Sequence, residues 1–237
     1  MRGWWKGALP APAIRTIRDM KIVLANPECD VSDPLYYMYR DLALSAADRC
    51  WLEKEHLRYD VTVIPPQDIC GEYVKTKGHY HPCSPKGMGY PELYEVIEGQ
   101  AQFLLQSHTL NDAILVIAGT GTRVIIPPGY GHISINPSND SMLALSNLVS
   151  TAFESEYGEY ESRHGAVYFI MNDGRIVRNR NYPNVPPLRR IIVVRGKDTA
   201  GRSYTGQIYS LIGDRKALAF LNEPEKYPDV FRGLLKG

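Results

Sequence analysis

Short segments rich in Val, Ile, Tyr and Thr, separated by Pro and Gly, run through the middle of this chain and constrain its fold most strongly. Residues 57–63 alternate apolar with polar side chains, which is typical of a half-buried strand. Similar segments predict strands at 69–76, 93–97, 101–106, 113–118, 122–126, 132–135 and 142–150. Helical periodicity is absent between Leu57 and Ser150. The pattern therefore predicts an all-β antiparallel sandwich or barrel.

The two ends of the chain differ in character from this β-rich core. The elements expected there are a short helix or irregular edge strands at 41–56, a hairpin at 166–178 around Asn172-Asp173-Gly174, strands at 191–194 and 206–212, and a closing helix at 225–236. We therefore predict three parts: an N-terminal segment (1–56) that packs on the barrel, a β-barrel domain (57–160) and a C-terminal extension (161–237).

Charge and cysteine content exclude several classes of protein. The chain of 237 residues has 27 Lys and Arg against 26 Asp and Glu, so it lacks the basic excess of a nucleic-acid-binding protein. No apolar run approaches the ~20 residues that span a bilayer, and the N-terminus does not resemble a signal peptide. We expect a cytoplasmic protein without membrane contact. Its scattered cysteines (Cys29, Cys50, Cys70 and Cys83) predict reduced thiols, although a hyperthermophile could pair two of them.

Histidines two residues apart are the first sign of a functional site. His79 and His81 would point to the same face of a strand, so both imidazoles could converge on one ion. Glu92 and Tyr94 share a strand face further along, and a Pro-Pro-Gly turn leads into His132 on another strand. Two other carboxylates, Glu95 and Glu98, compete with Glu92; we favour Glu92, because Glu95 faces the opposite side and Glu98 adjoins the turn.

These residues resemble the two motifs of the cupin superfamily. The second motif fits at Gly121, Pro127, Gly129, His132 and Asn136, and the first fits at His79, His81, Glu92 and Gly99. Ten residues separate His81 from Glu92, where cupins usually have three or four. The resemblance implies a cupin (double-stranded β-helix, or jelly-roll) barrel with N-terminal strands and a C-terminal extension. It also implies that His79, His81, Glu92 and His132 bind a metal ion.

The resemblance extends to the archaeal cupin-type glucose-6-phosphate isomerase family. It covers roughly residues 35–160, and the run from Thr76 to His81 is its most specific part. By this resemblance Thr62, Thr76 and Gly78 contact the substrate phosphate and Tyr157 lines the pocket. Lys75, Lys77 and Lys86 are further candidates for the phosphate. The chain departs from the family at Ser155, where a His is usual, and near Val149, where a Tyr is usual.

The implied function is a metal-dependent isomerase that interconverts glucose 6-phosphate and fructose 6-phosphate, in glycolysis and gluconeogenesis. Three imidazoles and one carboxylate suit one divalent transition metal per subunit: iron foremost, with Mn, Ni, Co or Zn as alternatives. Glu92 is the candidate base and Tyr94 would assist proton transfer, although a hydride shift stays open. A different cupin enzyme, such as an iron dioxygenase or another sugar isomerase, and a non-enzymatic sugar-binding cupin are the alternatives. We also expect a homodimer, because open sheet edges are commonly covered by pairing.

Overall fold

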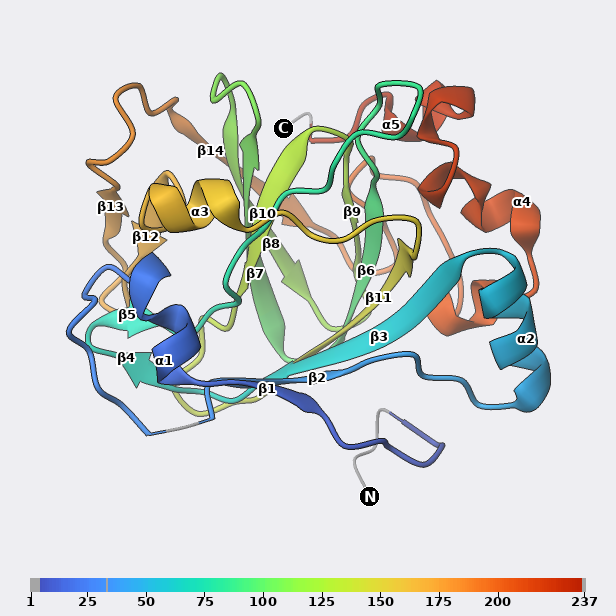
Figure 1. Cartoon of the computed structure of the whole chain (residues 1–237), viewed down its shortest axis with the longest axis horizontal. Coiled ribbons are helices and arrows are strands. Elements are labelled where there is room, and N and C mark those ends of the chain that lie inside the picture. Colours follow the sequence, from blue (N-terminus) through green and yellow to red (C-terminus); the bar gives the residue numbers. More distant parts are fainter. Residues whose placement is uncertain (1–4, 33, 236–237) are drawn as a thin grey trace.

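The computed structural model describes residues 5–32 and 34–235, and its main feature is a pair of facing β-sheets (Figure 1). The larger sheet has the strand order β1-β2-β3-β11-β6-β9 and the smaller one β10-β7-β8-β14. The larger sheet contains β1 (Ala13–Arg15), β2 (Tyr36–Tyr39), β3 (Leu57–Ile64), β11 (Leu143–Ser150), β6 (Glu92–Glu98) and β9 (Arg123–Ile126). The smaller contains β10 (Tyr130–Ile135), β7 (Gln100–Ser107), β8 (Ala113–Gly119) and β14 (Leu188–Val193).

The strand pairing is that of a jelly-roll. Every pair in the two main sheets is antiparallel except β14 on β8, and the sheets stay open at their edges. Alternate side chains from both sheets form one buried core, which includes Val61, Val96 and Phe103. Residues 57–150, all of them described, contain no helix. The predicted fold class, a cupin barrel, is confirmed.

Both ends of the chain add strands to these sheets. In the N-terminal part, β1 and β2 extend the larger sheet, with Tyr37 opposite Val63. The helix expected within 41–56 is present as α2 (Ala46–Lys54), which begins after the capping side chain of Ser45. Short helical turns precede it at α1 (Ile17–Met20) and η1 (Lys21–Val23). On the C-terminal side, β14 lies beside β8 at the edge of the smaller sheet.

The C-terminal part contains one confirmed element and two corrections. The hairpin is present as β12 (Tyr168–Ile170) and β13 (Ile176–Arg178). The strand predicted at 206–212 is wrong: this segment forms the turn η2 (Ile208–Leu211), because the Ile208 N–H donates to Glu95 Oε2 at 2.7 Å and not to a neighbouring strand. The predicted closing helix is two short turns, η4 (Pro224–Lys226) and α5 (Pro228–Phe231), and its last residue lies outside the described residues. The remaining helices are α3 (Gly158–Ser162), α4 (Arg215–Leu218) and η3 (Ala219–Leu221).

A disulfide bond joins the N-terminal segment to the barrel. Cys29 and Cys70 are bonded, with their Cα atoms 5.9 Å apart, so the prediction that all four thiols are reduced is wrong for this pair. Cys70 lies in the tight turn of a small hairpin, β4 (Asp68–Ile69) and β5 (Glu72–Tyr73), which replaces the single strand predicted at 69–76. Cys50 and Cys83 are free and exposed. The two bonded cysteines are 41 residues apart, and only the folded chain brings them together.

Among the helices of the described residues, none has both the length and the apolar character that crossing a lipid bilayer requires.

Candidate metal centre and active site

A cavity of about 330 Å³ lies over the inner face of the larger sheet. Its walls include residues from β2, β3, β6 and β11 of that sheet. The segments 76–81 and 153–157, which lie outside the main strands, complete the lining. The cavity therefore brings together parts of the chain that are more than 100 residues apart in sequence.

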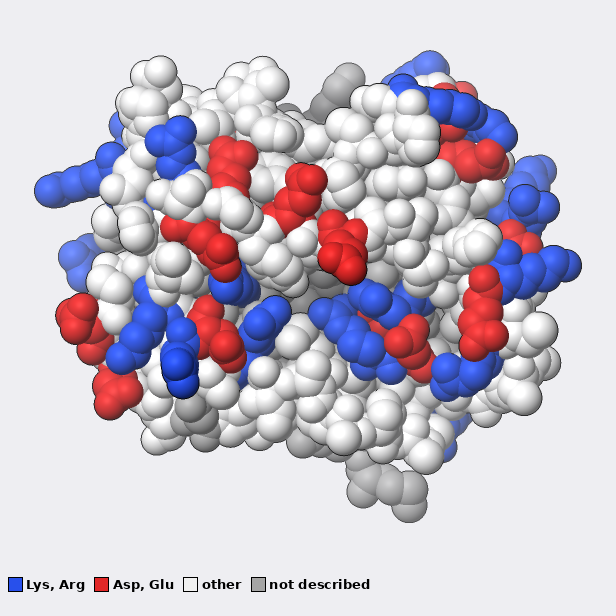
Figure 2. Space-filling view, in the orientation of Figure 1, with Lys and Arg blue, Asp and Glu red and all other residues white. Residues whose placement is uncertain are grey.

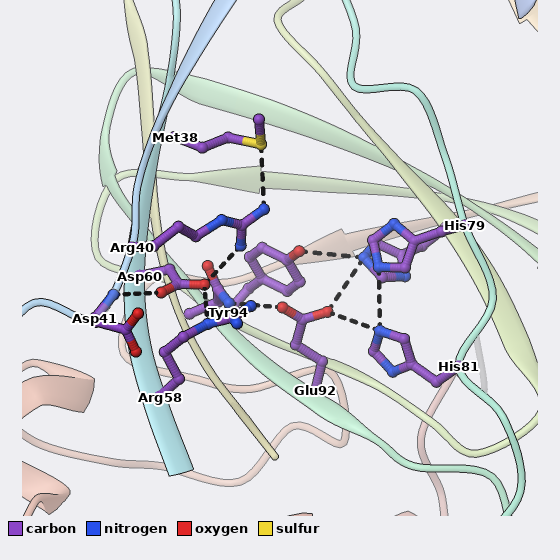
Figure 3. Close-up of polar contacts among 11 residues, drawn as sticks. Met38, Arg40, Asp41, Arg58, Asp60, His79, His81, Glu92 and Tyr94 are labelled. Carbon is purple, nitrogen blue, oxygen red and sulfur yellow. Dashed lines mark hydrogen bonds and ion pairs between the residues drawn. The ribbon is translucent and has the colours of Figure 1, made fainter. Parts of the chain in front are cut away.

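Four of the predicted site residues form a compact cluster in this cavity (Figure 3). One ligand atom from each of His79, His81, Glu92 and His132 lies within 4.8 Å of the others. Two backbone hydrogen bonds between His79 and His132, 3.3 and 3.1 Å long, hold the 79–81 segment against β10. Glu92 is the first residue of β6, so the two main sheets each contribute a ligand.

Neighbouring polar groups orient these side chains. His81 Nδ1 lies 2.9 Å from the Tyr90 carbonyl oxygen; this carbonyl can only accept, so Nδ1 carries the proton and the lone pair of Nε2 faces the cluster. Asn147 Nδ2 donates to Glu92 Oε1 at 2.7 Å. Tyr90 belongs to the insertion between His81 and Glu92, which therefore returns to fix a ligand.

The donor atoms that remain fit a divalent transition metal. Glu92 Oε2 is buried without a hydrogen-bond donor, and it lies 3.4 Å from His81 Nε2 and 3.3 Å from His132 Nε2. An unpaired buried carboxylate oxygen costs free energy unless a cation or donor faces it. Imidazole nitrogens with one carboxylate are a common ligand set for Fe, Mn, Co, Ni and Zn.

The protonation states of the cluster also suit metal binding. Burial lowers the pKa of His79 well below its usual value, and the neighbouring imidazoles of His132 and His81 lower it further. Burial likewise lowers the pKa of His132. Burial alone would raise the pKa of Glu92, but its contacts with His132 and His81 outweigh this effect and hold the pKa well below the usual range. Neutral imidazoles and an ionised carboxylate are the forms that coordinate a cation.

Tyr94 lies beside the cluster, on the same face of β6 as Glu92. Its hydroxyl is 3.1 Å from His132 Nε2. Burial raises the pKa of Tyr94 well above its usual value, and the charge of Glu92 raises it further. The phenol therefore stays protonated at neutral pH, with a proton available next to the metal ligands.

The residues predicted to hold phosphate line the same cavity. These are Thr62 on β3, Thr76 and Gly78 before the histidine pair, and Tyr157, whose ring centroid is 5.6 Å from that of His79. The Ser134 N–H donates to Thr76 Oγ1 at 2.9 Å, which fixes that hydroxyl. Val149 and Ser155, the two departures from the family pattern, also line the cavity.

The three candidate lysines have different environments. Lys77 lines the cavity and pairs with Glu161 at 2.6 Å. Lys75 is buried, where it forms an ion pair with Glu72 and lies outside the cavity lining, so it is removed from the candidates. Lys86 is exposed and pairs with Glu225 at 2.9 Å, also outside the cavity lining.

Two arginines in the cavity were not among the predicted site residues. Arg40 Nη1 and Arg58 Nε donate to Asp60 Oδ2, at 2.6 and 2.8 Å (Figure 3). Alternation along β3 places Arg58 and Asp60 on the same face as Thr62, and this was the available sequence signal. Arg40 carries no such signal, because only the pairing of β2 with β3 brings it there.

A model of the family described as "Glucose-6-phosphate isomerase (GPI)" matches residues 14–187. The chain belongs to this family. A glucose-6-phosphate isomerase of Thermococcus kodakarensis is 30% identical over 125 residues, which are 52% of this chain and 63% of that protein. The one of Thermococcus litoralis is 25% identical over 175 residues, or 71% of this chain and 85% of that protein. The first of these matches spans slightly less than two thirds of the relative's length.

Solved structures show more distant likenesses. An oxalate oxidase structure is 14% identical with a TM-score of 0.40, covering 53% of this chain and 57% of that one. Hazelnut vicilin is 15% identical with a TM-score of 0.40, covering 55% and 34%. These likenesses are too weak to bear on the site.

Proposed function

We propose that this protein is a metal-dependent isomerase that interconverts glucose 6-phosphate and fructose 6-phosphate. The observation that carries the proposal is the buried group of three histidines and Glu92, beside a protonated Tyr94, in a chain of the glucose-6-phosphate isomerase family. Aldose–ketose isomerisation moves one proton between C1 and C2 of the sugar. It requires a base near both carbons and an electrophile at both oxygens.

His79, His81, Glu92 and His132 would hold one divalent transition metal, iron foremost, with Mn, Ni, Co or Zn able to replace it. When bound, the metal would act as a Lewis acid that stabilises negative charge on the sugar oxygens. Asn147 keeps one Glu92 oxygen in place, so that the other faces the cluster.

Glu92 is the residue that we propose takes the proton from carbon. It is the one carboxylate of the four-residue cluster, and its low pKa keeps it ionised and able to accept. Tyr94, protonated and two residues further along the same strand face, would pass a proton between the two sugar oxygens. A hydride shift between the carbons is the rival route and is tested below.

The phosphate would lie at the other end of the cavity from the reacting carbons. Hydroxyl groups of Thr62, Thr76 and Tyr157, with the backbone N–H of Gly78, offer neutral donors to it, and Lys77 adds a positive charge. Such a site holds an anion without a phosphate-binding loop at a helix start.

We also propose a homodimer that acts in the cytoplasm, in glycolysis and gluconeogenesis. β1 is the edge strand of the larger sheet, and pairing with a second copy would cover such an edge. Charged sugar phosphates do not cross membranes unaided, which favours an enzyme in the compartment where they are made. Sedimentation as a monomer at micromolar concentration would contradict the dimer.

The proposed activity is tested by a coupled assay that converts fructose 6-phosphate into glucose 6-phosphate. Turnover should be lost after EDTA treatment and should return when Fe²⁺ or Mn²⁺ is added. Turnover that is unaffected by EDTA would contradict metal dependence. Absence of turnover with every metal, combined with sugar binding, would favour a non-enzymatic cupin, and oxygen consumption would favour a dioxygenase.

A further inference from the structure

The register of the larger sheet places Arg58 in the same row as Glu92. Arg58 is opposite Val149 in the β3–β11 pair, and Val149 is opposite Glu92 in the β11–β6 pair. Two strand spacings put the Cα atoms of Arg58 and Glu92 roughly 10 Å apart. Val149, the residue between them, has a short side chain that does not separate the two. Arg58 therefore faces the same part of the cavity as Glu92.

Asp60 fixes two guanidinium groups in this part of the cavity. Its carboxylate is fully buried and accepts from Arg40, Arg58 and the Asp41 N–H, the last at 3.0 Å. One carboxylate balances only one of the two arginine charges. The group formed by Arg40, Asp60 and Arg58 therefore keeps a net positive charge in a fixed geometry.

Several N–H groups of these arginines remain available to a ligand. In the described part of the chain, Nε is the one nitrogen of Arg58 that has an acceptor. Arg40 Nη2 has only Met38 Sδ, at 3.1 Å, and thioether sulfur is a weak acceptor. The two side chains line the cavity and are 38% and 33% exposed. In the space-filling view, Lys and Arg side chains lie on both sides of the central hollow (Figure 2).

These arginines lie apart from the residues that we assign to the phosphate. Thr62 is four residues along β3 from Arg58, which is roughly 13 Å at the rise of a strand. The Lys77 N–H donates to Tyr36 Oη at 3.2 Å, and Tyr36 begins β2 near the far end of β3, so the 76–78 segment belongs to the Thr62 end. Figure 3 shows Glu92 and Tyr94 between the histidines and the arginine pair.

We propose that Arg58 and Arg40 form a second anion-binding subsite, which takes a phosphate carried near the reacting carbons of a sugar. The ligand class is a sugar bisphosphate, with its other phosphate at the Thr62–Thr76 end; that half of the assignment rests on the proposed function. Guanidinium groups bind phosphate in a planar, two-bond geometry, and Asp60 has already oriented both. A bisphosphate bound in this way would compete with the monophosphate substrate.

The test compares fructose 1,6-bisphosphate with fructose 6-phosphate by calorimetric titration of the metal-free protein. We expect the bisphosphate to bind about tenfold more tightly, since hydrogen bonds to charged groups are the stronger ones. Arg58→Gln and Arg40→Gln should each reduce this preference to about twofold or less, while the affinity for fructose 6-phosphate changes little. Thr76→Ala should instead weaken both ligands together and leave their ratio unchanged.

Arg175→Gln is the matched control, because Arg175 is an exposed arginine that also pairs with an aspartate but lies outside the cavity. It should leave both affinities unchanged. Thermal unfolding checks that each variant is folded; should Arg58→Gln be unfolded, Arg58→Lys keeps the charge, loses the planar geometry and should lose most of the preference. Equal wild-type affinities, or a preference that survives both arginine variants, would overturn the subsite. Loss of isomerase turnover with the preference intact would overturn only the proposed function.

Discussion

At the scale of single residues, Glu92 has two proposed tasks, as metal ligand and as base. Glu92→Gln keeps a carbonyl oxygen that can bind metal weakly, but it cannot accept a proton. We therefore expect kcat to fall by about 10²–10⁴, with a smaller loss of metal. The measurement is turnover at saturating Mn²⁺ beside metal occupancy. Near-native turnover after metal is replenished would show that Glu92 is only a ligand.

Deuterium at C2 of the substrate separates the two routes left open for this residue. Exchange of the label into solvent indicates a base and an enediol intermediate. Full retention at C1 in the product favours a hydride shift, in which case Glu92 does not act as the base.

The sequence indicated these ligands because each lies in a recognisable local pattern. His79 and His81 are two apart, and His132 follows a Pro-Pro-Gly turn. Arg40 has no such pattern, since it meets Asp60 only when β2 pairs with β3. The Cys29–Cys70 bond escaped prediction for a similar reason: scattered spacing says nothing about which cysteines a fold brings together.

At the scale of elements, the segment between β5 and β6 carries much of the site and depends on Gly78. This residue has φ +83°, and a Cβ there would lie 2.8 Å from the Tyr160 ring and 2.9 Å from Ile133. Gly78→Ala should therefore destabilise the protein through both backbone strain and overpacking, by about 2–4 kcal/mol in total. It should also reduce metal binding, because His79 is the next residue.

Gly87 provides a matched control for this substitution. It has the same φ of +83°, but no atom lies within 4 Å of a Cβ built there. Gly87→Ala should cost only the backbone term, about 1–2 kcal/mol. Urea unfolding measures both variants, and equal losses would refute the steric part of the argument.

Elements were easier to predict from sequence where local patterning alone decides them. The core strands alternate in polarity and the 166–178 hairpin has Asn172-Asp173-Gly174 at its turn, and both predictions were confirmed. Residues 206–212 have strand-like composition, yet they form a turn because Glu95, far away in sequence, binds the Ile208 N–H. Tertiary contacts of this kind lie outside local patterning.

At the scale of the whole molecule, the Cys29–Cys70 bond ties the N-terminal segment to the barrel. The loop that it closes includes β2 and Arg40, which line the cavity. Cys70→Ser should lower the free energy of unfolding by about 2–4 kcal/mol, because the unfolded chain gains freedom. Cys50→Ser, at a free and exposed cysteine, should have little effect. Unfolding curves recorded with and without reductant check this; no difference in wild type would refute a stabilising bond.

The metal site should also link the two sheets of the molecule, since Glu92 comes from the larger sheet and His132 from the smaller. A metal that binds only the folded state at 100 times its Kd adds about 2.7 kcal/mol of stability. EDTA should therefore lower the Tm, and added Mn²⁺ or Fe²⁺ should raise it again. His132→Ala should abolish this metal-dependent shift, whereas His108→Ala, at an exposed histidine outside the cluster, should preserve it. A Tm that does not respond to metal in the wild-type protein would refute the ligand set without any assay of turnover.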